Sequence, residues 1–162
     1  MGFTKLLDKI NIQTIICPLK SELKKDVLHE LLDHFHNLEY LTSTVELFSN
    51  LDDKEKKINS ASGRGVAYHY HTSIEVEETL AVLGISKKGI DYAAGDGLRC
   101  HFILMILEPK NEPNKHRILI NLFQNLIKDS NIKSKLLELN SIQEVEDIIR
   151  DWEDNEENND VI

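Results

Sequence analysis

The sequence contains few cysteines, and their positions exclude two common roles. Only Cys17 and Cys100 are present among 162 residues, and neither belongs to a Cys-x-x-Cys pair. A zinc ribbon or a thioredoxin-like redox motif would need that spacing. Both cysteines lie in apolar stretches, so we predict two buried thiols rather than a disulfide.

Long apolar runs are also absent. The longest run, residues 102–107, has six residues, whereas a membrane-spanning helix needs about 20. Such a run suits a buried strand. The N-terminal residues MGFTKLLDK lack the apolar segment and small-residue cleavage site of a signal peptide. We therefore expect a cytoplasmic protein without membrane insertion.

Positive charge is scarce as well. The chain has 19 basic and 28 acidic residues, a net charge of −9, and no basic stripe, which argues against nucleic acid binding. Six acids lie in the last twelve residues, DWEDNEENNDVI, and without them 22 acids face 19 bases. We expect residues 151–162 to form a disordered, solubilising tail. Docking of this tail to a basic partner is the alternative.

Hydrophobic periodicity predicts strands mixed with helices in one domain, residues 1–150. The pattern favours strands over residues 10–16, 66–71, 79–85 and 99–107. It favours helices over residues 21–37, 114–128 and 132–139, from 42 onward, and from 141 onward, with Ser21, Thr42 and Ser141 as N-caps. The predicted class is α/β, a sheet covered by helices.

The segment 67–72, AYHYHT, places two histidines around one tyrosine. In a strand, His69 and His71 would share one face and Tyr70 would take the other. Such a pair can ligate zinc or copper when His101 or His116 adds a ligand. A metal-binding protein is therefore one hypothesis.

Phosphoryl transfer through histidine is a second hypothesis. A neutral imidazole is a good nucleophile near neutral pH, and its phosphoramidate is labile enough to pass the group on. Such a site needs donors for the phosphate oxygens. The preceding segment offers Lys54, Ser60, Ser62, Gly63, Arg64 and Gly65, and His116 is predicted at the start of a helix, where it can assist.

Three segments together resemble a known family. They are KEKKINSASGRGVAYHY at 54–70, GIDYAAGDG at 89–97, and ILEP at 106–109 followed by His116. Over residues 3–150 the chain resembles the enzyme IIA domains of the bacterial phosphotransferase system (PTS), in the fructose/mannitol class that includes the nitrogen-regulatory IIA proteins. The resemblance implies a mixed, five-stranded sheet with helices on both faces and no cofactor.

The resemblance also implies site residues, with one departure. Glu55, Ser60 and His116 stand where the family has the same residues, and its arginine falls at Lys54. The Pro-His dipeptide that carries the phosphorylated histidine falls at His69-Tyr70. A tyrosine hydroxyl, with a pKa of about 10, is a poor nucleophile at neutral pH, and its phosphate ester is not labile.

Three functions follow from this pattern. The first is a IIA-like regulator with a degenerate phosphorylation site, acting by binding other proteins. The second is a phosphocarrier in which His71 or His69 accepts the phosphate, with a local twist turning His71 toward His116. The third is the metal-binding protein. The partners that the resemblance implies are a phosphocarrier of the HPr type and a regulatory target such as a kinase or a transporter, and a sugar transport role would act through a separate permease.

Overall fold

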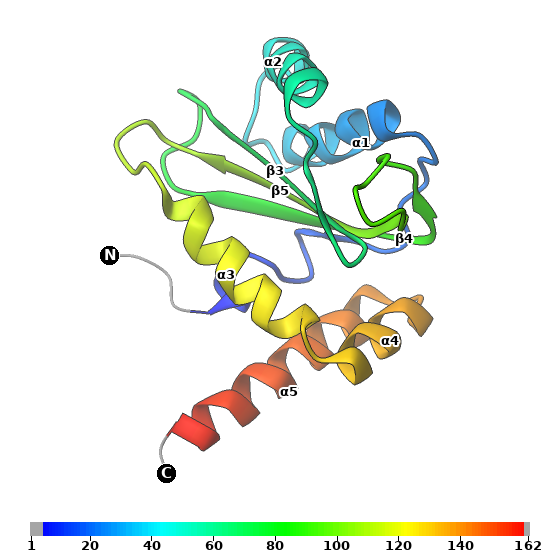
Figure 1. Ribbon diagram of the computed structural model, residues 1–162. Helices are drawn as coiled ribbons and strands as arrows, with labels where there is room; N and C mark the ends of the chain where they lie inside the picture. The colour runs from blue at the N-terminus through cyan, green and yellow to red at the C-terminus, as the bar shows by residue number, and fades with distance from the viewer. Residues whose placement is uncertain (1–4, 161–162) are drawn as a thin grey trace.

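The computed structural model describes residues 5–160, without the side chains of 158–160, as a mixed five-stranded sheet between two layers of helices (Figure 1). The strands are β1 (Ile15–Ile16), β2 (Ala61–Gly63), β3 (Val66–Thr72), β4 (Leu80–Ile90) and β5 (Cys100–Glu108). The helices are the 3₁₀ turn η1 (Leu6–Asp8), α1 (Lys24–Asn37), α2 (Val45–Lys57), α3 (Lys115–Ile127), α4 (Ser130–Glu138) and α5 (Ile142–Asp160). The predicted fold class is confirmed.

The sheet has the order β1-β4-β5-β3-β2 and combines both kinds of pairing. β1 is parallel to β4, and β3 is parallel to β5. β4 and β5 are antiparallel, as are β2 and β3. The apolar run predicted as a strand becomes β5, which lies at the centre and is buried along nearly its whole length. This agrees with the rule that a strand covered on both faces reads as a continuous apolar run.

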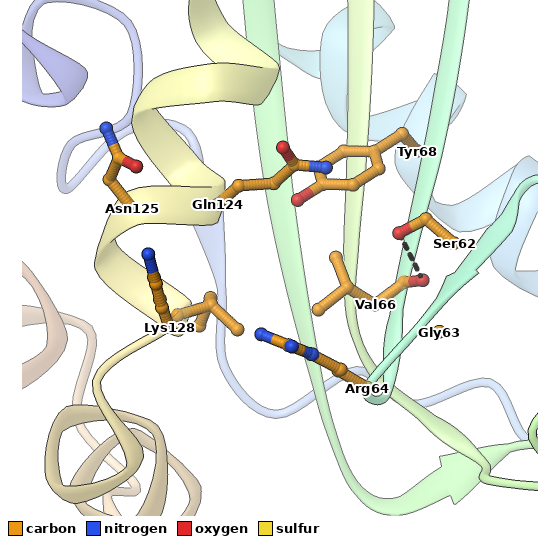
Figure 2. Close-up of a pocket in the computed structure, with 9 residues that line it drawn as sticks. Ser62, Gly63, Arg64, Val66, Tyr68, Gln124, Asn125 and Lys128 are labelled. Carbon is orange, nitrogen blue, oxygen red and sulfur yellow. Dashed lines mark hydrogen bonds between the residues drawn. The ribbon is translucent and has the colours of Figure 1, made fainter.

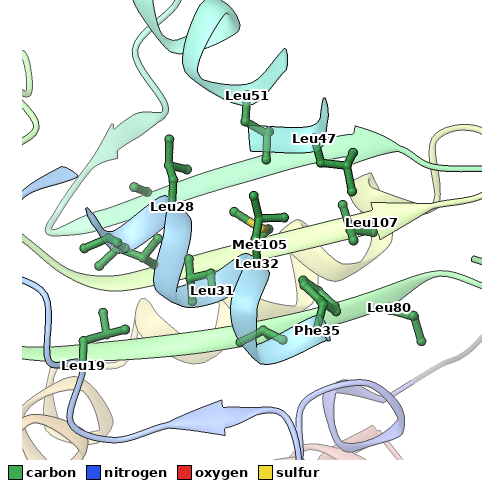
Figure 3. Packing of buried hydrophobic residues seen from close by; sticks show 14 of the residues in the cluster. Leu19, Leu28, Leu31, Leu32, Phe35, Leu47, Leu51, Leu80, Met105 and Leu107 are labelled. Atoms are coloured by element: carbon green, nitrogen blue, oxygen red, sulfur yellow. The ribbon is translucent and has the colours of Figure 1, made fainter. Parts of the chain in front are cut away.

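Each face of the sheet carries its own hydrophobic core. On one face α1 and α2 contribute Leu28, Leu31, Phe35 and Leu51, which pack against Met105 and its neighbours (Figure 3). On the other face α3, α4, α5 and η1 cover the remaining side chains of the strands. Because successive strand residues alternate between the two cores, the register of β3 decides which side chains reach which helices.

The N-terminal region differs from the prediction of a strand over residues 10–16. Only Ile15–Ile16 forms a strand. Residues 11–14 make a turn, because the Thr14 hydroxyl accepts the Asn11 amide at 2.9 Å and donates to the Lys9 carbonyl at 2.9 Å. Such local side-chain hydrogen bonds compete with strand pairing.

Two predicted helix caps also differ. The N-cap of α1 is Leu23, and that of α2 is Thr44. The Ser21 hydroxyl instead donates to Glu30 at 2.6 Å, and the hydroxyl of Thr42 donates to Glu75. Both hydroxyls thus tie loops to distant elements.

The acidic tail is helical where the structure describes it. α5 continues to Asp160, through residues that we expected to be disordered. Glu153 is buried and accepts the backbone amides of Leu6 and Leu7 at 2.7 and 3.2 Å. The correction follows from these contacts, because a tail that satisfies buried amides is part of the packed domain.

The two cysteines, both predicted to be buried thiols, differ in burial. Both thiols are free, with Cys100 buried and Cys17 half-buried. Burial raises the pKa of Cys100 to about 11. Across residues 5–160, every helix is too short or too polar to span a bilayer.

Candidate functional site

Strand β3 sends the histidine-tyrosine cluster to both faces of the sheet. Tyr68 and Tyr70 point to the α3 side, where they pack in the second core, the hydrophobic cluster that α3, α4, α5 and η1 cover. Ala67 belongs to the first core, the cluster on the face of α1 and α2. His69 points to the same face as Ala67. The prediction that Tyr70 and His69 point to opposite faces of the strand is confirmed.

Tyr70 lies between two side chains from different elements. Its ring stacks on the His116 imidazole, with ring centroids 3.9 Å apart and planes at 8°. The Lys54 ammonium lies 3.6 Å from the centroid of the Tyr70 ring and donates to the Tyr70 carbonyl at 3.0 Å. Burial lowers the pKa of Lys54, although Glu55 and Glu108 act in the opposite direction. The three side chains therefore form one layered unit.

Lys54 can reach Tyr70 because the edge of β3 is open at that position. β2 pairs with Val66 and Ala67, and the Ser60 carbonyl accepts the Tyr68 amide at 3.0 Å. Within residues 5–160, no strand pairs with the outer edge of β3 beyond them. Lys54 comes from the last turn of α2, and at this edge its ammonium contacts both the carbonyl and the ring of Tyr70. The shortness of β2 thus opens the route from α2 to the candidate site.

His116 is held by a carboxylate that the sequence reasoning did not single out. Glu108 lies at the end of β5. Its Oε1 is 2.9 Å from His116 Nδ1, and its Oε2 accepts the His116 backbone amide at 3.0 Å. Both residues are buried. The bidentate contact fixes the ring at the start of α3, with its Nε2 edge away from Glu108. The signal in the sequence is a glutamate ending a buried strand, eight residues before the histidine.

Glu55 and Ser60 form a second cluster, next to Lys54 in sequence. The Ser60 amide and Lys24 Nζ each donate to Glu55 at 2.9 Å, and the Ser60 hydroxyl also donates to this carboxylate. Burial raises the pKa of Glu55, but these hydrogen bonds outweigh it and bring the pKa below its usual value. Lys24 was missed because it lies on α1, 31 residues from Glu55, where no motif links them.

His69 belongs to this buried cluster. It is 2% exposed, its Nε2 lies 2.8 Å from the Tyr92 hydroxyl, and its Nδ1 lies 3.7 Å from Glu55. Burial lowers the pKa of His69 to about 4, although Glu55 acts in the opposite direction. The imidazole is therefore neutral at pH 7 and enclosed by protein.

His71 does not face His116. It shares the face of His69 and lines a hollow of 710 Å³ beside α2, together with Glu46, Asn50 and Glu75. Its Nδ1 lies 2.8 Å from the Thr72 carbonyl oxygen. The strand has no local twist that would turn His71 toward α3, because β3 pairs regularly with β5 from Val66 to Thr72.

The remaining candidates lie apart from Tyr70. Ser62, Gly63 and Arg64 line a separate hollow against α3. Gly63, Arg64 and Gly65 all have positive φ, as the turn of a tight β-hairpin requires. The structure thus brings Lys54, Tyr70 and His116 together and groups Glu55, Ser60 and His69. It separates the other four predicted residues, which are His71, Ser62, Gly63 and Arg64.

The geometry gives little support for a metal centre. Within the described part of the chain, His, Cys, Asp and Glu side chains form no cluster of three that would hold an ion. His101, named above as a further ligand, has its Nδ1 2.9 Å from the Ser86 carbonyl. His69 and His71 share a face as expected, but His116 lies on the other side of the sheet.

Comparison with solved structures places this fold among phosphotransferase IIA proteins. Nitrogen regulatory protein IIA-Ntr from Neisseria meningitidis superposes with a TM-score of 0.77 at 20% identity, over 88% of this chain and 97% of that one. IIA mannitol from Escherichia coli gives a TM-score of 0.73 at 19% identity, over 87% and 99%. The complex of enzyme IIA mannitol with phosphorylated enzyme IIB mannitol from the same organism gives 0.68 at 18%, over 85% and 94%. At these identities the likeness shows the fold alone.

Sequence comparison extends the likeness to a larger protein. The chain is 26% identical over 149 residues to the PTS system fructose-specific EIIABC component of Bacillus subtilis (strain 168). That match covers 92% of this chain but only 23% of the relative, so this chain spans less than a quarter of its length. The family model described as "Phosphoenolpyruvate-dependent sugar phosphotransferase system, EIIA 2" matches residues 8–152. With nearly the whole described fold inside that match, the chain belongs to the type-2 EIIA family of the phosphoenolpyruvate-dependent sugar phosphotransferase system.

Proposed function

We propose that this EIIA-family protein is a regulator that binds other proteins and holds no phosphate on histidine. The observation that carries the proposal is the layered unit at Tyr70, the position at which the resemblance places the phosphorylated histidine. There the Tyr70 ring lies between Lys54 and His116. The groups that would hold a phosphate instead contact an aromatic ring.

The chemistry of the phenol supports a site without turnover. Tyrosine has an ordinary pKa of about 10 and needs a strong base to act as a nucleophile at pH 7. His116 stacks face to face with Tyr70 at 8°, and its Nδ1 is bound to Glu108. Among the described residues the Tyr70 hydroxyl has no hydrogen-bond partner, so no base is placed to take its proton.

The two neighbouring histidines do not favour the phosphocarrier alternative. A phosphate on His69 would require opening the cluster with Glu55 and Tyr92, because this ring is enclosed. A phosphate on His71 would lie on the α2 side, beside the carboxylates of Glu46 and Glu75 and away from His116. Like charges there would oppose a phosphorylated imidazole.

The proposed partners follow from the family and from one similar structure. The Escherichia coli complex joins enzyme IIA mannitol to phosphorylated enzyme IIB mannitol. By analogy, we expect this chain to bind a phosphocarrier of the HPr type, and to act in the cytoplasm on a target such as a kinase or a transporter. Without a labile histidine, binding would respond to the partner's phosphorylation and not to the chain's own.

Intact mass spectrometry after incubation with phosphoenolpyruvate, enzyme I and HPr tests the proposal. We expect no added phosphate under conditions that label an ordinary IIA protein, and saturable binding of HPr in a parallel calorimetric titration. An acid-labile phosphate that His71→Ala or His69→Ala abolishes would overturn the proposal in favour of a phosphocarrier. An acid-stable phosphate on Tyr70 would also overturn it, as would the absence of HPr binding together with the absence of label.

A further inference from the structure

A second hollow lies on the α3 side of the sheet, away from Tyr70. It occupies 430 Å³ between the β2–β3 hairpin and the C-terminal half of α3 (Figure 2). This volume is within the range of small-molecule sites, about 300–1,000 Å³. Its lining residues are Ser62, Gly63, Arg64, Val66, Tyr68, Gln124, Asn125, Ile127 and Lys128.

The charge of this hollow is opposite to that of the protein. Two of its lining residues are basic and none is acidic, in a chain with 28 acids and 19 bases. Arg64 extends from the hairpin toward α3, where Lys128 lies (Figure 2). In the part of the chain that the structure describes, neither side chain forms an ion pair with a carboxylate. The hollow therefore offers two uncompensated cations to an anion.

The hairpin holds Arg64 in place through its backbone. The Arg64 amide donates to Asp96 at 2.8 Å, and Lys133 donates to the Arg64 carbonyl. Asp96 and Lys133 are therefore engaged by the main chain, and the Arg64 guanidinium is left for a ligand. A guanidinium suits phosphate, because its fork of donors binds two oxygens at once.

Neutral groups complete the lining and select the rest of the ligand. Gln124 and Asn125 present amides, and Ser62 presents a hydroxyl that donates to the Val66 carbonyl at 3.4 Å (Figure 2). Amides and hydroxyls can both donate to and accept from alcohol groups. Val66 and Ile127 supply a small apolar surface against which a carbon skeleton can pack.

We propose that this hollow binds a small phosphorylated polyol, of the sugar phosphate class, with its phosphate on Arg64 and Lys128. The hydroxyl groups would meet Ser62, Gln124 and Asn125. Tyr68 shares its face of β3 with Tyr70, and Gln124 shares α3 with His116. The ligand would therefore contact β3 and α3, the two elements that carry Tyr70 and His116. The proposal does not depend on whether Tyr70 or a histidine carries phosphate.

The test is an NMR and calorimetric titration of the full chain with glucose 6-phosphate, with inorganic phosphate and glucose as comparison probes. We expect saturable binding of glucose 6-phosphate, with amide shifts at Ser62, Arg64, Gln124 and Lys128. Inorganic phosphate should bind about tenfold more weakly, because it lacks the hydroxyl contacts. Glucose should not saturate over the same range, because it lacks the charge.

Matched variants separate a site from general charge attraction. Arg64→Gln and Lys128→Gln should each weaken glucose 6-phosphate binding about tenfold, since each removes a charge-assisted hydrogen bond. Lys25→Gln removes one positive charge from an exposed position of α1 and should leave the affinity for glucose 6-phosphate unchanged. Equal losses in all three variants, no saturable binding, or shifts confined to Lys54, Tyr70 and His116 would each overturn the proposal.

Discussion

At the residue scale, the proposed function turns on one side chain, Tyr70. Tyr70 occupies the centre of the candidate site, between a cation from Lys54 and an oriented imidazole from His116, the two groups that the proposal assigns to holding a phosphate. A carboxylate-held histidine is pre-organised, because Glu108 fixes both its ring and its backbone. The supporting geometry therefore remains while the proposed acceptor is missing.

This arrangement predicts that Tyr70→His gains phosphate acceptance. An imidazole at position 70 would be a good nucleophile near neutral pH, and its phosphoramidate would be labile, whereas a phenol is neither. Intact mass spectrometry should show one acid-labile phosphate per chain in Tyr70→His and none in the matched Tyr70→Phe. A Tyr70→His protein that folds, binds HPr and stays unlabelled would show that Lys54 and His116 do not support transfer.

His69 predicts a specific dependence of stability on pH. Its pKa is lowered to about 4 in the folded chain because it is buried, against about 6.5 in an unfolded chain. Between these pH values the unfolded chain binds a proton at His69 that the folded chain does not. The contribution of His69 to the free energy of unfolding is therefore fully present above pH about 6.5 and is lost as the pH falls toward about 4. The loss is on the order of 2–3 kcal/mol.

Urea unfolding at pH 7 and pH 4.5 checks this dependence. His69→Gln keeps a polar partner for the Tyr92 hydroxyl and should lose less stability on acidification than the wild type. His71→Gln removes a half-exposed imidazole from the same strand and should retain the acid sensitivity of the wild type. Equal acid losses in the wild type and His69→Gln would contradict the assignment to His69.

At the same scale, the sequence indicated part of the site. The tyrosine and the second histidine fall in motifs with fixed spacing, and the structure places them together. Lys24 and Tyr92 complete the buried cluster around Glu55 and His69, yet they lie in segments far from both. Contacts of this kind arise where α1 packs against α2 and where the segment after β4 meets β3, and no local pattern encodes them.

At the scale of elements, long periodic segments were predictable and short ones were not. The helices α1, α3 and α5 begin within three residues of their expected starts, because an apolar face repeats over many turns. β1 and β2 have two and three residues, too few for a period to be seen. β2 lies outside the strands predicted from the pattern, although it forms the hairpin with β3.

The hairpin turn yields a prediction at this scale. Gly65 has φ +81°, and a Cβ there would lie 3.3 Å from the Arg99 carbonyl oxygen. Gly65→Ala should therefore lower the free energy of unfolding by about 1–2 kcal/mol, the cost of a left-handed alanine. Gly95→Ala is the control, because a Cβ there meets nothing within 4 Å. A urea midpoint for Gly65→Ala no lower than that of Gly95→Ala would refute this reading of the turn.

At the scale of the whole molecule, α5 closes the fold by holding the N-terminal segment. Glu146 accepts the Ile12 amide at 2.7 Å, and Glu153 accepts the amides of Leu6 and Leu7. Burial raises the pKa of Glu153. Composition alone suggested a disordered tail, because a count of acids does not show that Glu153 accepts two backbone amides 147 and 146 residues away.

Two truncations distinguish a packed helix end from a solvated tail. Ending the chain after Arg150 removes Glu153 and Trp152, which packs against the second core, so the free energy of unfolding should fall by several kcal/mol. Ending it after Glu157 keeps every side-chain contact of α5 described above and should leave stability near that of the full chain. If both truncations unfold at the urea midpoint of the full chain, α5 does not stabilise the domain beyond residue 150.

The single substitution Glu153→Gln isolates the buried carboxylate from the rest of the helix. One amide oxygen can still accept a backbone N–H, but the new NH₂ group faces a donor, so one of the two buried amides of η1 loses its partner. We expect the free energy of unfolding to fall by about 1–3 kcal/mol at pH 7, whereas Glu156→Gln, on the exposed side of α5, should change little. Hydrogen exchange at Leu6 and Leu7 gives the sharper readout, because their amides should exchange faster in Glu153→Gln alone. Unchanged exchange at both amides would mean that another contact holds the two ends of the chain together.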